Sequence, residues 1–542
     1  MIGLISNSPT VGVPMEAIKV ALPIGVGLAS AAFLAMKAAA NSGYTTDKSI
    51  PMASVRQGDS THDNEYYDDQ DAFLRRCEEE YGPVFNIHLL NKPLTVVSGP
   101  QIREVFMNDD FSAGDAIDEF TGMRAFFDSV RKSNKDVDNR VIHEVVRDTI
   151  SPNLSLFTPR IVEQLEKNLE KELGTCPKEE GGKFVAKPIL VLQEMVANAM
   201  ANVFVGPEIA KSREVINTFI TATADFGRVL GNGERRMSFW RAFTRRANYK
   251  VFNPLQIHVR ILVEASTPVI LERRRLEAEA NEKGEKWERP DDILQKLLDN
   301  FDKYGFVDLE DVCGHLMILI LASVHTTTDT STNLLYYMAT YPEYLDKLYE
   351  EQQQVLDAVQ AEREKERQEL VKKGEPIGED LDPAHDRDLS AATIKRMVHM
   401  DSFVREVFRF RTERLTLIHR ARKDIRLSSG ITISKGSSVI INMRSAHQSP
   451  EQGEDVTEFR PWRFVGKPKA ATKAGSDFLP FGMGKHACPG RFLAIQELKT
   501  IGVLMISKYS KIEIEDPSKA MKILRSRIGT PNCTGLTFTS RG

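Results

Sequence analysis

The stretch Phe478–Glu497 reads FLPFGMGKHACPGRFLAIQE and places a single cysteine, Cys488, between two turns rich in glycine and proline. The apolar residues that follow predict a helix beginning just after Cys488. A lone cysteine is most often a small buried apolar residue. Here, however, backbone N–H groups of a glycine-rich turn at a helix start would stabilise a thiolate. The stretch therefore favours a metal thiolate, with Gly484 allowing a tight turn.

Two other interpretations of this loop are weaker. Gly482, Gly484 and Ala487 fit a loose G-x-G-x-x-A nucleotide pattern, which has meaning only after a strand of a βαβ unit. The preceding residues, SDFLPF, contain a proline and do not resemble such a strand. A nucleophilic thiol needs a histidine base and an orienting partner, and His486 lies only two residues from Cys488. Neither alternative displaces the metal thiolate.

Composition narrows the class of protein. The 542 residues are 41% hydrophobic and 27% charged with a net charge of −4, so a large soluble core is expected. The negative balance argues against nucleic acid as the main partner. The five cysteines are scattered and form no C-x-x-C pair, which indicates neither a disulfide framework nor a zinc module. A reducing compartment is expected for the folded part.

The N-terminal region differs from the rest of the chain. Residues Val20–Met36 read VALPIGVGLASAAFLAM, without a charge, and predict a membrane anchor within residues 1–40. A cleaved signal peptide with its small-residue site at 38–40, and a helix lying on the protein surface, are the alternatives. The chain after this segment is more basic than the chain before it, which favours a cytosolic catalytic part.

The organisation of the remaining chain is mainly helical. Residues 41–70 are polar and acidic and predict a linker, and globular character begins at Asp71 and continues over 71–542. Tyr81–Gly99 predicts a β-hairpin, and short strands return over Ile425–Asn442. The charged run Tyr349–Lys373 predicts a solvated helix. We therefore expect an α+β fold, mainly α with small sheets near both ends of one domain.

The pattern Phe481-x-x-Gly484-x-His486-x-Cys488-x-Gly490 resembles the cysteine loop of the cytochromes P-450, the haem-thiolate monooxygenases. The resemblance implies that Cys488 is the axial ligand of the iron of haem b. It also implies that Phe481 shields the sulfur and that Gly490 lets the next helix lie close to the cofactor. The family usually has arginine at the position of His486, so its contact with a haem propionate depends on protonation or on a neutral N–H donor.

A second match lies upstream. Glu406 and Arg409 are three residues apart in FVREVFRFR, and on a helix this spacing allows a charge-assisted pair. Taken alone, such a pair occurs by chance in many charged helices. The later segment FRPWRF contains Arg463 and resembles the family's second arginine segment. The resemblance implies a structural triad of Glu406, Arg409 and Arg463 behind the cysteine loop.

A third match is LMILILASVHTTTDTST, from Leu316 to Thr332, where apolar residues lead into a cluster of hydroxyls. One interpretation is a buried helix whose threonines bond back to carbonyls. The resemblance is to the helix that crosses the oxygen-binding side of the haem. It implies that Thr326 donates to the oxygen side and holds a water in the proton path. His325, where the family usually has an acid, would feed that path, and Ser323 replaces the usual glycine.

The fourth match, VIHEVVRDTISPNLSLF, resembles the family helix that normally carries a tryptophan and an arginine four residues apart. His143 and Arg147 stand at those positions. Arg147 is the first candidate for a propionate contact, and Arg420 in LIHRARKD is the second. An ordinary surface arginine is the alternative for each.

The resemblance, of fungal microsomal type, implies the P-450 fold: one large helix-rich domain with a β-rich lobe. It implies insertion of one atom of O2 into an apolar substrate, with electrons from an NADPH-cytochrome reductase and cytochrome b5 as a further donor. The expected location is the endoplasmic reticulum membrane, with the catalytic domain facing the cytosol. No nucleic acid partner is expected.

Two other functions remain open at this point. One is a non-oxygenating haem-thiolate isomerase or dehydratase, and Thr326 argues against it because such members tend to lose this threonine. The other is a haem-binding sensor or carrier without catalysis. The presumed pocket segments 111–127 and 222–229 are partly rich in phenylalanine. Such walls suit a bulky, nearly neutral skeleton, so a steroid or terpenoid is the expected substrate.

Overall fold

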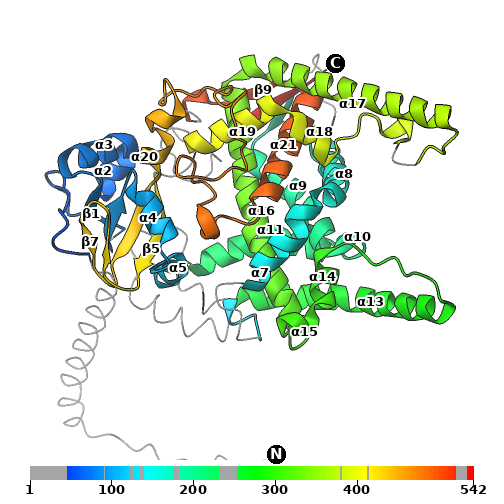
Figure 1. Cartoon of the computed structure of the whole chain (residues 1–542), viewed down its shortest axis with the longest axis horizontal. Helices are drawn as coiled ribbons and strands as arrows, with labels where there is room; N and C mark the ends of the chain where they lie inside the picture. The colour runs from blue at the N-terminus through cyan, green and yellow to red at the C-terminus, as the bar shows by residue number, and fades with distance from the viewer. Residues whose placement is uncertain are drawn as a thin grey trace, which may run out of the picture.

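The structure is a computed structural model that describes residues 46–90, 92–121, 124, 127–132, 140–174, 182–230, 253–378, 381–411, 414–519 and 534–541. Figure 1 shows a β-rich lobe beside a larger helical body, in agreement with the expected mainly α fold with small sheets. The predicted membrane anchor over 1–40 lies outside the described residues.

The lobe is built on a five-stranded sheet in the order β1-β2-β8-β5-β3. Its strands are β1 (Val84–Leu89), β2 (Lys92–Val97), β8 (Ser438–Asn442), β5 (Leu415–Ala421) and β3 (Phe111–Ser112). β1 and β2 are antiparallel, with Val84 opposite Val97, which confirms the hairpin predicted over Tyr81–Gly99. β2 runs parallel to β8 and β5 runs antiparallel to it. The sheet thus joins the hairpin to β8, which lies in the region predicted to form strands over Ile425–Asn442, and adds β5 and β3, which the sequence analysis did not predict.

Both faces of this sheet are covered. Helices α2 (Asp63–Asp68) and α3 (Gln70–Tyr81) pack one apolar cluster on one face, and α4 (Gln101–Met107) packs another on the opposite face. Leu74 and Cys77 of α3 are fully buried against the β1 side chains. The central strands are therefore held between apolar layers, as expected for a sheet buried on both sides.

The prediction of a linker over 41–70 is wrong for most of its described part. The amide of Ala53 donates to the Asn86 carbonyl at 2.8 Å, and Met52 forms a parallel bridge with Asn86 at the edge of β1. His62 is fully buried, with Nε2 3.1 Å from the Ala53 carbonyl. Backbone groups of this segment, together with the His62 ring, thus form hydrogen bonds with the free edge of β1, and its polar composition alone does not reveal this role.

The helical body is organised around α16 (Leu309–Thr340). Asp308 caps its first turn by accepting from the Asp311 amide at 2.9 Å. Within the described ranges α16 is the only helix long and apolar enough to cross a membrane, but 67% of that apolar window is buried in protein. It is therefore the central core helix. It packs against α9 (Pro188–Phe204), α11 (Arg213–Leu230), α13 (Pro254–Lys283), α19 (Val398–Arg411) and α21 (Arg491–Lys508).

One close approach on α16 requires glycine. A Cβ at Gly314 would lie 2.0 Å from the carbonyl oxygen of Val130. The chain around Val130 therefore rests directly on the backbone of α16. This contact is set by the absence of a side chain rather than by a special backbone conformation.

The other elements complete the body and the lobe. A three-stranded sheet runs in the order β4-β10-β9, and β6 pairs with β7. α17 (Leu345–Lys373) covers the charged run predicted as a solvated helix, and Gly374, with a φ of +70°, caps its C-terminus. The remaining bounds are α5 (Ala113–Thr121), α7 (Arg140–Val145), η2 (Val146–Ile150), η3 (Ser151–Asn153), α8 (Leu154–Glu172), β4 (Lys183–Val185), α10 (Gly206–Ile209), α14 (Ile293–Asp299), α15 (Phe301–Tyr304), η5 (Pro342–Tyr344), α17 (Leu345–Lys373), η7 (Pro383–His385), α18 (Ala391–Arg396), β6 (Ile425–Arg426), β7 (Thr432–Ile433), α20 (Met443–His447), η8 (Pro450–Gln452), η9 (Gly484–His486), β9 (Tyr509–Ile514) and β10 (Leu536–Ser540).

Candidate functional site

The cysteine loop forms the tight turn expected from its sequence. Gly482 and Gly484 have φ values of +71° and +62°, in the left-handed region that favours glycine. The amide of Cys488 donates to the Phe481 carbonyl at 2.7 Å and closes the loop. Ser151 Oγ donates to the Pro489 carbonyl at 3.2 Å, so η3 fixes the loop from the other side.

Cys488 differs from the other cysteines that the structure describes. Cys77 and Cys313 are buried, and burial raises the pKa of each thiol to about 12. Cys488 reaches the surface at the N-terminus of α21. The crowding of its sulfur by protein raises its pKa, whereas the Gly490 and Arg491 backbone N–H groups and the Arg491 charge lower it. These donors at a helix start are those that a thiolate ligand needs.

Gly490 and Phe481 are the other two loop residues with a predicted role. Gly490 has a φ of −79°, so its backbone conformation does not require glycine. A Cβ there would lie 3.8 Å from the Cys488 sulfur and 3.9 Å from Val146 Cγ1, so glycine leaves open space beside the sulfur. The Phe481 ring packs with its centroid 5.0 Å from that of Phe408 on α19. This contact ties the loop to α19.

The central helix has an exposed patch in the middle of a buried length. Ala322, His325 and Thr326 are exposed, whereas Leu316–Leu321 and Thr327–Met338 are buried. Residues three and four apart share one face of a helix, so the patch is a single face. Because α16 packs on α21 (Figure 1), this face and the cysteine at the start of α21 belong to neighbouring helices. This face of the core helix is therefore accessible to a ligand.

The hydroxyl and imidazole of this patch have defined partners. Thr326 Oγ1 donates to the Ala322 carbonyl at 2.8 Å and lies 3.3 Å from the Ser323 carbonyl. Thr326 therefore forms the bond to a helix carbonyl that the alternative interpretation predicts, although its side chain is exposed. Crowding by the surrounding protein, and next the charge of Arg411, lower the pKa of His325 below its ordinary value. Both effects favour the neutral form of the imidazole.

The three residues of the predicted structural triad are brought together. Arg409 Nε and Nη2 each lie 2.8 Å from a carboxylate oxygen of Glu406, and Arg463 Nε lies 3.1 Å from the same group. All three residues are buried. The remaining guanidinium donors reach backbone carbonyls, including that of His447 at 2.8 Å. A buried cluster with its donors engaged in this way avoids the cost of isolated charges.

The residues predicted to contact propionates differ in their exposure and in their partners. Arg147 is 67% exposed and pairs with Asp148 at 2.6 Å, and His143 is also exposed. Arg420 is half-buried on β5 and pairs with Glu119 of α5. His486 is exposed on η9. The structure thus gives both arginines a carboxylate partner within the protein, which the sequence analysis did not anticipate.

The structure adds one residue that sequence reasoning missed. His419 on β5 is buried, its Nδ1 lies 2.8 Å from the Leu417 carbonyl, and its Nε2 has no hydrogen-bond partner among the described residues. Burial, together with a smaller effect of the nearby His486, lowers its pKa to about 4, although the bond to the Leu417 carbonyl acts in the opposite direction. A β-bulge after Thr416, with Leu417 at a φ of +55°, accompanies this placement. The available signal was a histidine directly before the candidate residue Arg420.

Comparison with known proteins identifies the class. The family model described as "Cytochrome P450" matches residues 64–372 and 377–532. The chain therefore belongs to the cytochrome P450 family. It is an oxidoreductase of the monooxygenase type that uses haem with a cysteine thiolate ligand and O2. As in the family generally, it takes electrons from a redox partner and acts on a small molecule.

Individual relatives are distant but cover most of the chain. The chain is 24% identical to "Cytochrome P450 monooxygenase 151" of Postia placenta over 469 residues, covering 84% of this chain and 85% of that protein. It is 26% identical to "Cytochrome P450 monooxygenase paxP" of Penicillium paxilli over 405 residues, covering 73% and 72%. The solved structure "Retinoic acid bound cyanobacterial CYP120A1" shares the fold with a TM-score of 0.56 and 17% identity, covering 91% and 100%.

The residues present fit a haem. An exposed thiol at a helix N-terminus offers an axial sulfur, and the open face of α16 leaves space on a neighbouring helix. Because Nδ1 of buried His419 donates to the Leu417 carbonyl, its orphaned Nε2 would donate to a propionate as part of a protonated ring, a form that the negative charge of the propionate favours.

Proposed function

We propose that this chain hydroxylates a bulky apolar substrate, a steroid or terpenoid, with O2 and electrons from an NADPH-dependent reductase. The observation that carries the haem assignment is the exposed Cys488 thiol, held by backbone donors at the start of α21. Haem bound there supplies the oxidising chemistry, while the protein binds, orients and excludes water.

The test of the ligand is the absorbance of the reduced carbonyl complex. Cys488→Ala should lose the thiolate-specific band, and the buried Cys313→Ala serves as the matched control that keeps it. Survival of the band in Cys488→Ala would overturn the assignment. Consumption of NADPH and O2 with product formation then separates a monooxygenase from an isomerase, a dehydratase or a passive carrier.

Thr326 and His325 are assigned to proton delivery on the exposed face of α16. The Thr326 hydroxyl bonds to the Ala322 carbonyl at 2.8 Å and can exchange that partner for a water or a ligand in the cavity. Because the pKa of His325 is lowered, its neutral ring can accept a proton at one nitrogen and donate from the other. Thr326 and His325 are therefore suited to passing one proton at a time while the imidazole stays neutral between transfers.

We assign the cofactor's carboxylates to His419, His486 and Arg420, with Arg147 and His143 as further candidates. His419 is already buried with Nε2 unused, whereas Arg420 must share its charge with Glu119. His419→Phe should therefore weaken haem retention, measured as loss of haem to an excess of apo-myoglobin. Equal haem loss from wild type and His419→Phe would remove it from this role.

The substrate assignment rests on the expected wall of the cavity. Phe111, counted among the wall residues by its sequence, is instead buried with the sheet, and Phe127 is buried in the main core. Phe126 lies outside the described residues. The open face of α16 and the apolar residues before it remain in support of an apolar skeleton. Progesterone, testosterone and a polycyclic terpenoid should shift the haem spin state; binding only of fatty acids or small aromatics would refute the assignment.

For location we propose the endoplasmic reticulum membrane, held by residues 1–40, with NADPH-cytochrome reductase as electron donor and cytochrome b5 as a second donor. The support is the uncharged run Val20–Met36 and the basic bias after it. The full chain should resist extraction by alkaline carbonate, and a chain starting at residue 41 should not. Recovery of a secreted protein cleaved near residue 40 would favour the signal-peptide alternative.

A further inference from the structure

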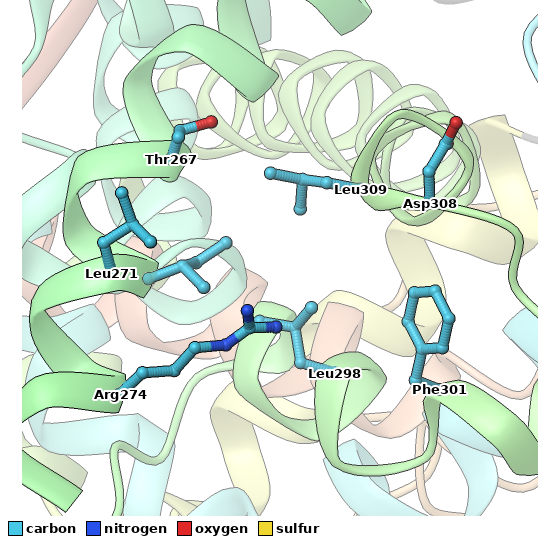
Figure 2. Close-up of a pocket in the computed structure, with 8 residues that line it drawn as sticks. Thr267, Leu271, Arg274, Leu298, Phe301, Asp308 and Leu309 are labelled. Atoms are coloured by element: carbon cyan, nitrogen blue, oxygen red, sulfur yellow. The ribbon is translucent and has the colours of Figure 1, made fainter. Parts of the chain in front are cut away.

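A hollow lies far from the cysteine loop, where α13, α14 and α15 meet the start of α16. Its volume is about 310 Å³. Figure 2 shows Leu271 and Leu309 pointing into it from opposite sides, with Arg274 reaching along its floor toward Leu298. Leu309 begins α16, and Thr326 lies about 25 Å further along the helix axis. The hollow is therefore distinct from the exposed face of α16.

The walls of this hollow are apolar and partly open to solvent. Ile270, Leu271, Leu298, Phe301 and Leu309 supply most of the lining. Leu271 is 59% exposed, and Val307, close in sequence to the lining residue Leu309, is 62% exposed. Large apolar side chains gathered and exposed at one concave place indicate a surface that a ligand can cover. The volume is at the lower end of the range for small-molecule sites.

The charges around the hollow leave one cation available. On α13, Arg273 pairs with Asp292 at 2.6 Å, and Arg275 pairs with Glu272 and Glu279. Arg274, between them, has neither an ion pair nor a hydrogen bond with any residue in the described part of the chain.

The carboxylate that also lines the hollow is already engaged. Asp308 accepts from Lys132 Nζ at 2.6 Å and from the Asp311 amide at 2.9 Å. Lys132 also pairs with Glu310 at 2.5 Å, and Asp308 forms no ion pair with Arg274. The hollow presents an apolar wall beside one guanidinium that forms no ion pair within the described residues, and such a site is complementary to an amphipathic anion.

We propose that this hollow binds a medium-chain fatty-acid carboxylate. The carboxylate would form a bidentate pair with the Arg274 guanidinium, whose planar fork matches it. The chain would cover Leu271, Leu298 and Leu309 and remove their exposed surface from water. The site is separate from the substrate cavity, so the proposal stands independently of the proposed steroid or terpenoid hydroxylation.

The test is calorimetric titration of the full-length holoprotein with decanoate, after the haem cavity has been filled with the bulky azole clotrimazole. Wild type and Arg275→Gln, a matched neutralisation on the neighbouring residue outside the hollow, should bind equally. Arg274→Gln should bind decanoate at least about tenfold more weakly than wild type, because a charge-assisted hydrogen bond is lost. Arg274→Lys should recover part of the affinity. Decan-1-ol should bind more weakly than decanoate and should not respond to Arg274→Gln.

A second variant tests the apolar wall independently. Leu309→Glu places a carboxylate at the first residue of α16, where the helix start favours it, so folding should be preserved. It should abolish decanoate binding. The proposal is overturned if Arg274→Gln and Arg275→Gln bind alike, if Leu309→Glu binds normally, or if clotrimazole alone prevents decanoate binding, which would place the fatty acid in the haem cavity.

Discussion

Replacement of Glu497 by glutamine should stabilise the protein at neutral pH. Glu497 lies on α21 and is buried against α16, where Thr327 donates a hydrogen bond to its carboxylate. Its Oε1 atom has no hydrogen-bond partner among the described residues. Burial raises the pKa of this carboxyl from 4.5 to about 8. At pH 7 the folded protein therefore holds a neutral acid at a place where an ionised one is unfavourable.

The sign of the effect follows from proton linkage. Between pH 4.5 and about pH 8 the folded state keeps a proton that the unfolded state releases, so stability falls as pH rises across this window. Each pH unit corresponds to about 1.4 kcal/mol, so the loss reaches about 4 kcal/mol at pH 7.5. Glutamine keeps the neutral shape and removes this loss, while a weaker bond to Thr327 costs about 1 kcal/mol. The net gain expected at pH 7.5 is about 3 kcal/mol.

The assay is urea unfolding of the holoprotein followed by far-ultraviolet circular dichroism at pH 5.5 and pH 7.5. Glu497→Gln should match wild type at the lower pH and exceed it at the higher pH. Glu366→Gln, an exposed change on α17, is the control and should follow wild type at both. An equal difference at the two pH values, or a less stable Glu497→Gln protein at pH 7.5, would refute the reasoning.

Three further changes test the framework and the site. Arg409→Ala leaves the buried Glu406 without its bidentate partner, costs about 3–5 kcal/mol, and should give little haem-loaded protein; a normal yield of holoprotein would contradict the structural role. Thr326→Ala should keep haem content but release more peroxide per NADPH consumed, and unchanged coupling would move proton delivery to His325. Gly314→Ala forces a Cβ against the Val130 carbonyl and should lower stability by about 1–3 kcal/mol, seen as a lower Tm of the holoprotein; an unaltered Tm would show that the Val130 segment yields freely.

The parts of the site that sequence reasoning placed correctly are those set by local geometry. The turn before Cys488 follows from glycines that adopt positive φ, at 482 and 484. The pair of Glu406 and Arg409 follows from helical spacing, because residues three apart share a face. In both cases the residues involved lie within a few positions of one another in the chain. The third member, Arg463, was reached only through the resemblance to a family.

The parts that sequence reasoning missed depend on contacts between distant segments. His419 is buried because β5 is paired with β8 and bulged near Leu417, which a strand pattern does not show. The segment 50–70 is folded because its polar groups meet the edge of β1. The pairing of Arg420 with Glu119 likewise joins two elements far apart in the chain. Polar composition alone gives the same prediction for a linker and for an edge-covering segment.

The hydroxyl-rich half of α16 shows why two interpretations of one motif need not compete. Thr326, Thr330 and Thr332 each donate to the carbonyl four residues earlier, at 2.8 Å, which gives these polar side chains a hydrogen-bond partner within a core helix. Thr326 differs only in being exposed. A hydrogen bond of this kind contributes about 1 kcal/mol net, so a ligand or water that reaches the exposed hydroxyl can replace the carbonyl at small cost. The proton delivery that we propose for Thr326 needs this combination, because the bond holds the side chain in place and is weak enough to be exchanged.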